Sequence, residues 1–251
     1  MKLIFRNIVI VWLSTVMINA LAQNTPGNYY VPIKTFNLST LWRDNTIQSD
    51  GGDRLAFPEP LGIIGNDYQR FYIHYTSVVK DAVNPCLYIV KGKTRVKNNI
   101  CSFKGTIAVL SAKRFNESYI GYKQGKVVCD VHLYEDSSSR GSGYIKGKLT
   151  TQFCINKKGQ MLYDALDSNA DGYFNNQFEG TWTSYKTGVS KMCNWGDYRI
   201  PDSKGLDGGA GEFIVNEKYK NNGWQNYVNM NSQDKAVAKK AVDEENRKWW
   251  E

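Results

Sequence analysis

The chain has 251 residues, 22% of them charged, and a formal charge of +8. Its length is within the range that an all-β sandwich or barrel occupies as one domain, and such a chain folds without help from a metal or disulfide. The positive charge permits contact with anionic glycans or lipid head groups, and nucleic acid is not the expected partner.

The first 22 residues have the pattern of a secretory signal peptide. Lys2 and Arg6 precede an apolar run over residues 8–22 that ends in Ala-Leu-Ala. About 15 apolar residues are too few for a membrane span, which needs roughly 20, and no second apolar segment follows. We therefore expect a mature chain without a transmembrane segment, exported to the periplasm, the cell surface or the medium. The alternative is an uncleaved N-terminal anchor.

Short alternating segments follow, and they predict antiparallel strands. In residues 70–79, Phe71, Ile73 and Tyr75 alternate with Tyr72 and His74. The other expected extended segments are residues 29–36, 61–65, 87–90, 105–110, 126–135, 143–155, 160–163 and 177–185, with irregular polar stretches at 45–54 and 57–60. Such strands, joined by tight turns, are typical of a meander that closes into a barrel or folds as a sandwich.

Residues 204–251 differ from the β domain that we place at residues 23–203. Four glycines between 205 and 211 indicate a flexible or tightly turning loop, and residues 216–222 a short helix. Apolar residues then recur at helical spacing after Ser232, the expected N-cap. We expect this C-terminal helix to pack on the β domain. The alternative, a membrane-surface or partner helix, is weakened by the acidic residues 243–245.

A resemblance to a known architecture supports this fold. A Gly-x-Trp motif at Trp182, within an antiparallel meander that a C-terminal helix follows, resembles the calycin architecture of lipocalins and avidins. Residues 175–185 and 193–201 are also similar to uncharacterised exported bacterial proteins. The resemblance implies a barrel of about eight strands with a cup for a ligand, and no activity. The N-terminal Gly-x-Trp of true lipocalins is missing, since Leu41 and Thr40 precede Trp42.

Five cysteines lie in the part of the chain that we expect to be exported, where disulfides persist. Residues that are equally far from a hairpin turn lie opposite each other, close enough for a disulfide. A turn at residues 141–143 would place Cys129 opposite Cys154, and a turn at residues 92–94 would place Cys86 opposite Cys101. The alternation of strand faces conflicts with the first pairing, and free buried thiols are the alternative to both. The cysteines and the two histidines do not have the spacing of a zinc site.

Basic residues recur at every second position from residue 91 to 97. On one continuous strand, Lys91, Lys93, Arg95 and Lys97 place four cations on one face. We favour a hairpin turn at residues 91–94 with solvated lysines instead, because Gly92 is typical of turns.

Residues 167–172 match the first half of a calcium-binding loop, D-x-N-x-D-G. The twelfth position is Phe178 where a glutamate is needed, and Glu179 comes one residue late. A polar turn between strands is therefore the alternative to a weak calcium site, calcium being the one cofactor that we consider. The ligands of that site would be Asp167, Asn169, Asp171, Tyr173 and Asn175.

Aromatic and histidine side chains are the candidates for ligand contact, because exposed Trp and Tyr rings stack on sugars or close an apolar cavity. They are Trp182, Tyr185, Trp195, Tyr198, His74 and His132. The alternative is that the aromatic rings only fill the barrel. The two histidines, with Asp130, also permit a general acid–base cluster, but no nucleophile motif accompanies them, so we predict no catalytic residue.

We therefore expect an exported, non-catalytic binding protein for a small apolar molecule or a glycan. One alternative is a structural or interaction protein of the cell envelope, whose barrel is filled and whose partner is another envelope component. The second alternative is a hydrolase. A cavity of about 300 Å³ or more, lined by Trp and Tyr, favours binding over the structural role.

Overall fold

The structure, a computed structural model, describes residues 27–49 and 51–251. The signal peptide expected at residues 1–22 lies outside the described residues. Strands are the commonest regular element of the described chain, and they form a two-stranded and a nine-stranded antiparallel sheet. The small sheet contains β1 (Thr46–Gln48) and β2 (Arg54–Ala56), and the large sheet contains β3 (Leu61–Ile64), β4 (Gln69–Lys80), β5 (Leu87–Val96), β6 (Asn99–Tyr119), β7 (Tyr122–Glu135), β8 (Gly143–Ile155), β9 (Met161–Tyr163), β10 (Asn175–Ser184) and β11 (Ser190–Asp197).

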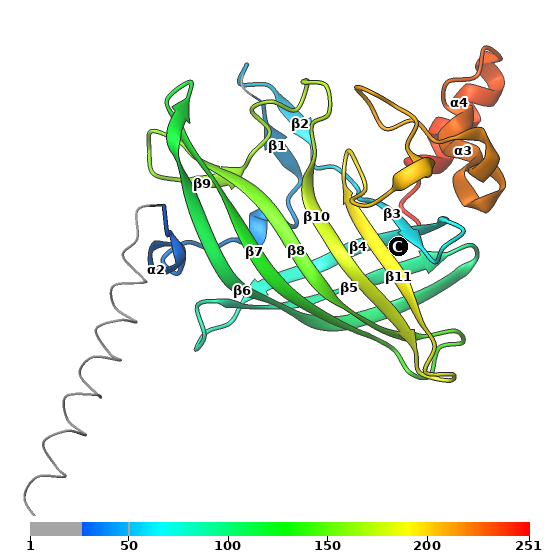
Figure 1. Ribbon diagram of the computed structural model, residues 1–251, viewed down its shortest axis with the longest axis horizontal. Helices are drawn as coiled ribbons and strands as arrows, with labels where there is room; N and C mark the ends of the chain where they lie inside the picture. The colour runs from blue at the N-terminus through cyan, green and yellow to red at the C-terminus, as the bar shows by residue number, and fades with distance from the viewer. Residues whose placement is uncertain (1–26, 50) are drawn as a thin grey trace, which may run out of the picture.

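Eight strands of the large sheet close into a barrel-like ring (Figure 1). Their order is β10-β11-β3-β4-β5-β6-β7-β8, and β8 also pairs with β10, from Thr150 opposite Gln177 to Gly143 opposite Ser184. β9 pairs with the last residues of β8 and lies outside the ring. The predicted fold class, an antiparallel barrel-like meander with a C-terminal helix, is confirmed.

Alternating side chains build the barrel interior. In β4, Phe71, Ile73 and Tyr75 are buried, and the residues between them are more exposed, as the sequence predicts. The rings of Phe178 and Trp195 stack on each other inside the barrel, with centroids 3.6 Å apart. The middle of the barrel is therefore filled by side chains, while one cavity lies at each end.

The hairpin turn expected at residues 91–94 is wrong, because β5 continues through these residues to Val96. The chain reverses at Lys97, which has a positive φ of 55°. Lys91, Lys93 and Arg95 therefore share the outer face of one strand, which is the arrangement that we did not favour. Gly92 is needed for close approach and not for a turn, since a Cβ there would lie 2.1 Å from the carbonyl oxygen of His74.

The strand register also differs from the two symmetric hairpins on which the disulfide pairings were based. Cys129 lies opposite Leu149 and Cys154 opposite Gln124, while Cys101 lies opposite Thr94. The β7–β8 turn spans residues 136–142, and inward-facing Leu133 and Ile145 beside it fix the register. All five cysteines, Cys86 and Cys193 included, are buried and form no disulfide within the described part of the chain.

The segment before β3 covers one end of the barrel. It contains the one-turn helix α2 (Tyr30–Ile33), the 3-10 helix η1 (Ser39–Leu41), β1 and β2. The extended segment expected at residues 29–36 is thus wrong: the side chain of Asn28 accepts a hydrogen bond from the Tyr30 amide, and the chain turns there. This segment places Trp42, the residue that follows η1, in the main apolar cluster of the barrel.

The C-terminal region packs on the outside of the barrel, next to β3 and β4 (Figure 1). Its elements are the 3-10 helices η2 (Lys204–Leu206) and η3 (Glu217–Tyr219), the π-helical turn η4 (Lys220–Trp224), α3 (Gln225–Asn229) and α4 (Lys235–Glu245). Ile63 of β3 joins Phe213 and Trp224 in a second apolar cluster. Helix α4 is capped by Asp234, whose side chain accepts from two amides of the first turn, and not by Ser232. No helix in the described residues is long and apolar enough to cross a membrane.

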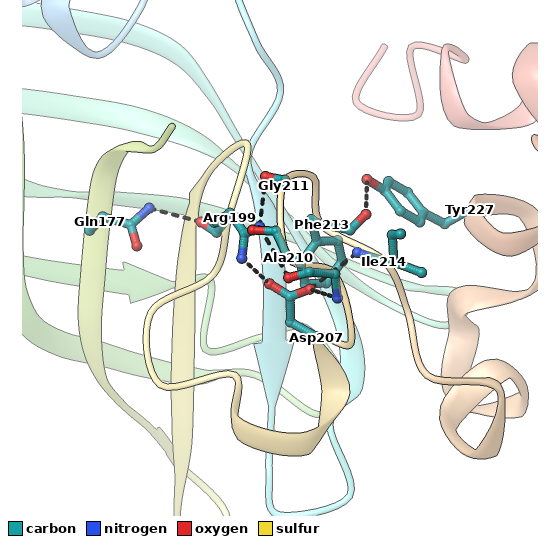
Figure 2. A network of polar contacts seen from close by, with 9 residues as sticks. Gln177, Arg199, Asp207, Ala210, Gly211, Phe213, Ile214 and Tyr227 are labelled. Atoms are coloured by element: carbon teal, nitrogen blue, oxygen red, sulfur yellow. Dashed lines mark hydrogen bonds and ion pairs between the residues drawn. The ribbon is translucent and has the colours of Figure 1, made fainter. Parts of the chain in front are cut away.

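A half-buried arginine holds the Gly-rich loop in one conformation (Figure 2). The guanidinium group of Arg199 lies 2.8 Å from an Asp207 carboxylate oxygen and donates to the carbonyls of Gly209, Ala210 and Gly211. Asp207 in turn accepts from the Ile214 amide. The loop is therefore a tight, hydrogen-bonded turn. The sequence had left open whether it is flexible or tightly turning.

Candidate functional site

A cavity of about 350 Å³ opens at the end of the barrel where β3 and β10 begin and β11 ends. Its inner walls consist of Trp42, Phe57, Tyr75, Leu149, Asn176, Trp195 and Asp197. Its mouth is more polar and includes Arg43, Asp44, Asn45, Glu59, His74, Lys248, Trp250 and Glu251. The cavity thus has aromatic walls, two buried polar groups at its base and a charged rim; we call it the end cavity.

Asp197, the last residue of β11, is the buried acid of the end cavity. Its side chain has no exposed surface, and its Oδ2 accepts hydrogen bonds from the Tyr163 hydroxyl (2.9 Å) and the Asn176 amide (2.7 Å). Burial raises the pKa of Asp197 to about 8, Glu59 adds to the rise, and the two hydrogen bonds oppose it. At neutral pH the carboxyl group is therefore mostly protonated. Since Oδ2 already accepts twice, the proton lies on Oδ1.

Two polar atoms in this cavity have no partner in the described part of the chain. They are Oδ1 of Asp197 and the hydroxyl of Tyr75. Burial also raises the pKa of Tyr75 well above its usual range, so it stays a neutral phenol. Native proteins leave few buried polar atoms unsatisfied, and each such atom needs an explanation. Here both atoms belong to residues that line the same cavity.

A chain of hydrogen bonds fixes the position of Trp42. Its indole N–H donates to the Thr151 hydroxyl (2.8 Å), which donates to the side-chain oxygen of Asn176 (2.8 Å). The amide group of Asn176 then bonds both Asp197 and the carbonyl oxygen of Leu41. Trp42 and Asp197 are therefore held in one connected network, which gives the cavity a preorganised wall.

A β-bulge directs Asn176 into the barrel. The register between β10 and β11 shifts between Asn175 and Phe178, and Asn176 has a positive φ of 46°, which asparagine tolerates better than most residues. The side chain of Asn175 replaces the missing strand contacts, because it bonds both the amide and the carbonyl of Gln152.

The mouth of the cavity is closed on one side by the C-terminal residues. His74 Nδ1 lies 2.9 and 3.0 Å from the two carboxylate oxygens of Glu59. The indole ring of Trp250 lies on the imidazole ring with centroids 3.7 Å apart. The same end of the chain is anchored by Trp249, which is buried against Tyr72.

The six candidate ligand residues do not form one site. Trp195 and His74 line the end cavity, but Trp182 lies at the opposite end of the barrel, where its indole N–H donates to Glu135. Tyr185 and Tyr198 lie outside the barrel, beside Tyr144 and Tyr173 respectively.

The two histidines do not form a joint acid–base cluster. His74 is on β4 and His132 is on β7, with β5 and β6 between them, so the two strands alone are about 14 Å apart at the usual strand spacing. The register adds an offset along the strands, because His74 leads through Lys93 to Ser102 of β6, whereas His132 lies opposite Thr106. His132 contacts Asp130 on the outer face of the barrel (3.1 Å), whereas His74 contacts Glu59. The arrangement of His74, His132 and Asp130 in one cluster is therefore wrong.

The calcium site stays a prediction. Asp167, Asn169 and Asp171 are exposed in one loop, but the hydroxyl of Tyr173 donates to the Asp164 carbonyl, and Asn175 is engaged with Gln152. Within residues 27–49 and 51–251, no three His, Cys, Asp or Glu side chains form a group that could hold a metal ion.

Sequence reasoning missed the polar core of the cavity. Asn176 and Asp197 stood inside the segments that resemble other exported proteins, and neither was named as a site residue. Their positions in the strands were the available signal. Asn176 is two residues before Phe178 in β10, and Asp197 is two residues after Trp195 in β11, so each polar residue stands in line with a buried aromatic residue.

The fold and the cavity define the chain as a barrel-like β protein with a preorganised pocket at one end. No family model, curated protein or solved structure matches it. The function is therefore argued from the site itself.

Proposed function

We propose that the protein is a non-catalytic binding protein that holds one small molecule in the end cavity. The observation that carries this proposal is the pair of unpartnered buried atoms, Oδ1 of Asp197 and the hydroxyl of Tyr75, in one cavity. Leaving a buried polar atom unsatisfied costs about 1–3 kcal/mol. A ligand that bonds both atoms removes that cost, and burial of its body between aromatic walls adds to affinity.

The chemistry of the walls describes the ligand. A neutral Asp197 donates its proton, so the ligand carries a hydrogen-bond acceptor such as a carbonyl or hydroxyl group and needs no positive charge. Trp42 and Trp195 favour a flat, apolar body. A volume of about 350 Å³ is at the small end of ligand pockets and fits a molecule of about 20 non-hydrogen atoms. A small apolar molecule with one polar group is therefore favoured over a glycan chain at this site.

Export is part of the proposal and depends on residues 1–22. Their charged start, apolar run and Ala-Leu-Ala end support removal by a signal peptidase. N-terminal sequencing of the protein isolated outside the cytoplasm tests this directly. A chain that begins at Gln23 is expected, and a cytoplasmic chain that begins at Met1 would contradict export.

Titration with the neutral aromatic dye N-phenyl-1-naphthylamine tests the binding function. We expect its fluorescence to rise on binding with one dye per chain. Asn45→Trp, which narrows the mouth, should weaken binding about tenfold or more, equivalent to about 1.4 kcal/mol. Asn98→Trp is the matched control, because Asn98 lines the cavity at the opposite end of the barrel. Equal loss in both variants would contradict binding at the end cavity.

A hydrolase is the second candidate, because the buried carboxyl group of Asp197 shares the end cavity with the more exposed carboxyl group of Glu59. Asp197 is buried and holds its proton at neutral pH, while the Glu59 side chain is 48% exposed at the mouth. Pairs of carboxyl groups in different environments serve glycoside hydrolysis as acid and base. Turnover of aryl glycosides that Asp197→Asn abolishes would favour this candidate over simple binding.

A further inference from the structure

The outer face of the barrel carries a row of lysine and tyrosine side chains across four strands. Lys91 of β5 lies directly opposite Lys104 of β6, Lys104 lies opposite Tyr134 of β7, and Tyr134 lies opposite Tyr144 of β8. Their chain neighbours, such as Val90 and Phe103, are buried inside the barrel, so the four side chains of the row face outward.

The lysines of this face outnumber the acidic residues beside them, which are Glu135 and Asp136. Lys91 and Lys104 are a like-charge pair directly across two strands, which is destabilising unless an anion lies between them. Lys93 lies two residues from Lys91 on the same face, and the ammonium group of Lys146 lies 5.0 Å from the ring centroid of Tyr144. None of these four lysines forms an ion pair with another residue that the structure describes.

The nearby carboxylates are already engaged. Glu135 accepts hydrogen bonds from Thr94, from the Gly143 amide and from Trp182. Asp136 accepts from the amide and hydroxyl of Ser138. These carboxylates keep their charge, and Lys104 is, after the hydrogen bonds from Ser138, among the causes that lower the pKa of Asp136, so Asp136 offsets part of the charge of Lys104. The four lysines still outnumber the two carboxylates beside them.

A groove and a series of rings complete the surface. Lys91, Lys93, Lys104 and Tyr134 line a depression of about 670 Å³, and Glu135 and Asp136 lie at its edge in β7 and the turn that follows. From Tyr134 the rings continue to Tyr144 and Tyr185, with successive centroids 6.3 and 5.9 Å apart, and Tyr134 and Tyr185 are 48% and 40% exposed. We name this surface, Lys91, Lys93, Lys104, Lys146, Tyr134, Tyr144 and Tyr185, the lysine–tyrosine face.

We propose that the lysine–tyrosine face binds an acidic polysaccharide chain. Separate ammonium groups suit isolated carboxylate or sulfate groups along a polymer, and tyrosine rings stack on the apolar faces of its sugars. Arg95 continues the outer face of β5 beyond Lys93, but its guanidinium group lies over the Tyr72 ring (3.9 Å to the centroid), so the free cations of the surface are the four lysines. The surface is long and faces outward, so it accepts a polymer that the end cavity cannot hold; the two sites adjoin only at Lys93, which lies opposite His74 in the register of β4 and β5.

Binding to polygalacturonate at about 0.15 M salt, a concentration that screens distant charges, tests the proposal. The variant Lys91→Gln/Lys104→Gln/Lys146→Gln removes three charges from the face, and each lost ion pair weakens binding modestly. We expect about tenfold weaker binding in total. The control is Lys235→Gln/Lys239→Gln/Lys240→Gln on α4, which has the same net charge and leaves the face intact. Equal weakening in both variants would overturn the proposal.

A second variant separates sugar recognition from simple charge attraction. Tyr134→Ala/Tyr144→Ala should weaken binding to polygalacturonate and leave the weaker binding to polyglutamate, which has charge without rings, unchanged. Circular dichroism should show that both multiple variants keep the β-sheet spectrum. Wild-type binding to polyglutamate or oligothymidylate as tight as to polygalacturonate would overturn the proposal in favour of a general anion or nucleic-acid surface.

Discussion

Trp250 lies face to face on His74, with the ring planes 6° from parallel. One residue is next to the end of the chain, and the other is on the outer side of β4. Because both line the mouth of the end cavity, the C-terminus forms part of its wall. Part of the mouth of the cavity is therefore formed by a contact between segments far apart in sequence.

Removal of that contact should change the kinetics of binding more than stability. Trp250→Ala deletes a stack of about 0.5–1.5 kcal/mol and opens the mouth. We expect N-phenyl-1-naphthylamine to enter and leave faster in stopped-flow measurements, while Trp250→Phe, which keeps a stacking ring, stays near wild type. Identical rates in all three proteins would show that the C-terminus does not border the entry path.

The raised pKa of Asp197 predicts a specific pH dependence of stability. The pKa is about 8 in the folded protein and near 4 in the unfolded chain, so the folded state binds the extra proton between these values. The free energy of unfolding then falls as pH rises from 4 to 8, by at most about 1.4 kcal/mol per pH unit from this group. Asp197→Asn has no such proton and keeps the two hydrogen bonds at its carbonyl oxygen.

Urea denaturation of both proteins at pH 5 and pH 8 measures this contribution. The variant should gain stability relative to wild type as pH rises, since all other titrating groups are shared. A difference between the two proteins that is the same at both pH values would mean that Asp197 ionises normally.

The hydroxyl of Thr151 connects Trp42 to Asn176, and its loss should destabilise the fold. Thr151→Val keeps the shape and leaves two buried polar partners unsatisfied, at a cost of about 1–3 kcal/mol. The neighbouring Thr150→Val is the matched control, because Thr150 is on the outer side of β8. Urea midpoints should fall for the first variant only. If the urea midpoints of both variants fell equally, the loss of stability would come from valine in this strand and not from the broken hydrogen bonds of Thr151.

Arg199 should control the local stability of the Gly-rich loop. Arg199→Lys loses the planar group that bonds Asp207 and three carbonyls at once (Figure 2). We expect limited proteolysis within residues 207–215 to become faster, with little change in the midpoint of global unfolding. The exposed Arg114→Lys should leave the cleavage pattern unchanged. Resistance equal to wild type in Arg199→Lys would contradict this role.

The strands of the barrel were predictable because each has one buried face. Period-2 alternation marked β4, β8 and β10 to within a few residues. The same signal failed at β5, where Gly92 was taken for a turn although it serves close packing against His74 and Phe103. β11 was not predicted as a strand, because it is buried on both faces from Cys193 to Asp197 and so has no alternation of buried and exposed residues there.

The candidate site was less predictable than the fold. Trp195 and His74 were identified as ligand candidates and do line the end cavity. Asn176 and Asp197 were not, because their roles depend on a bulge and on burial that arise only when β10 and β11 pair. The disulfide hypothesis failed for a related reason: the centre of each hairpin is set by facing apolar residues along the strands and not by the nearest glycine.

Native mass spectrometry of protein purified from its source tests the central claim most directly. The folded protein should be heavier than the denatured chain by one molecule of about 20 non-hydrogen atoms, and Asn45→Trp should lack it while Asn98→Trp keeps it. A folded mass equal to that of the bare chain, both after purification and after incubation with a small-molecule extract of the same cells, would contradict a ligand site in the end cavity.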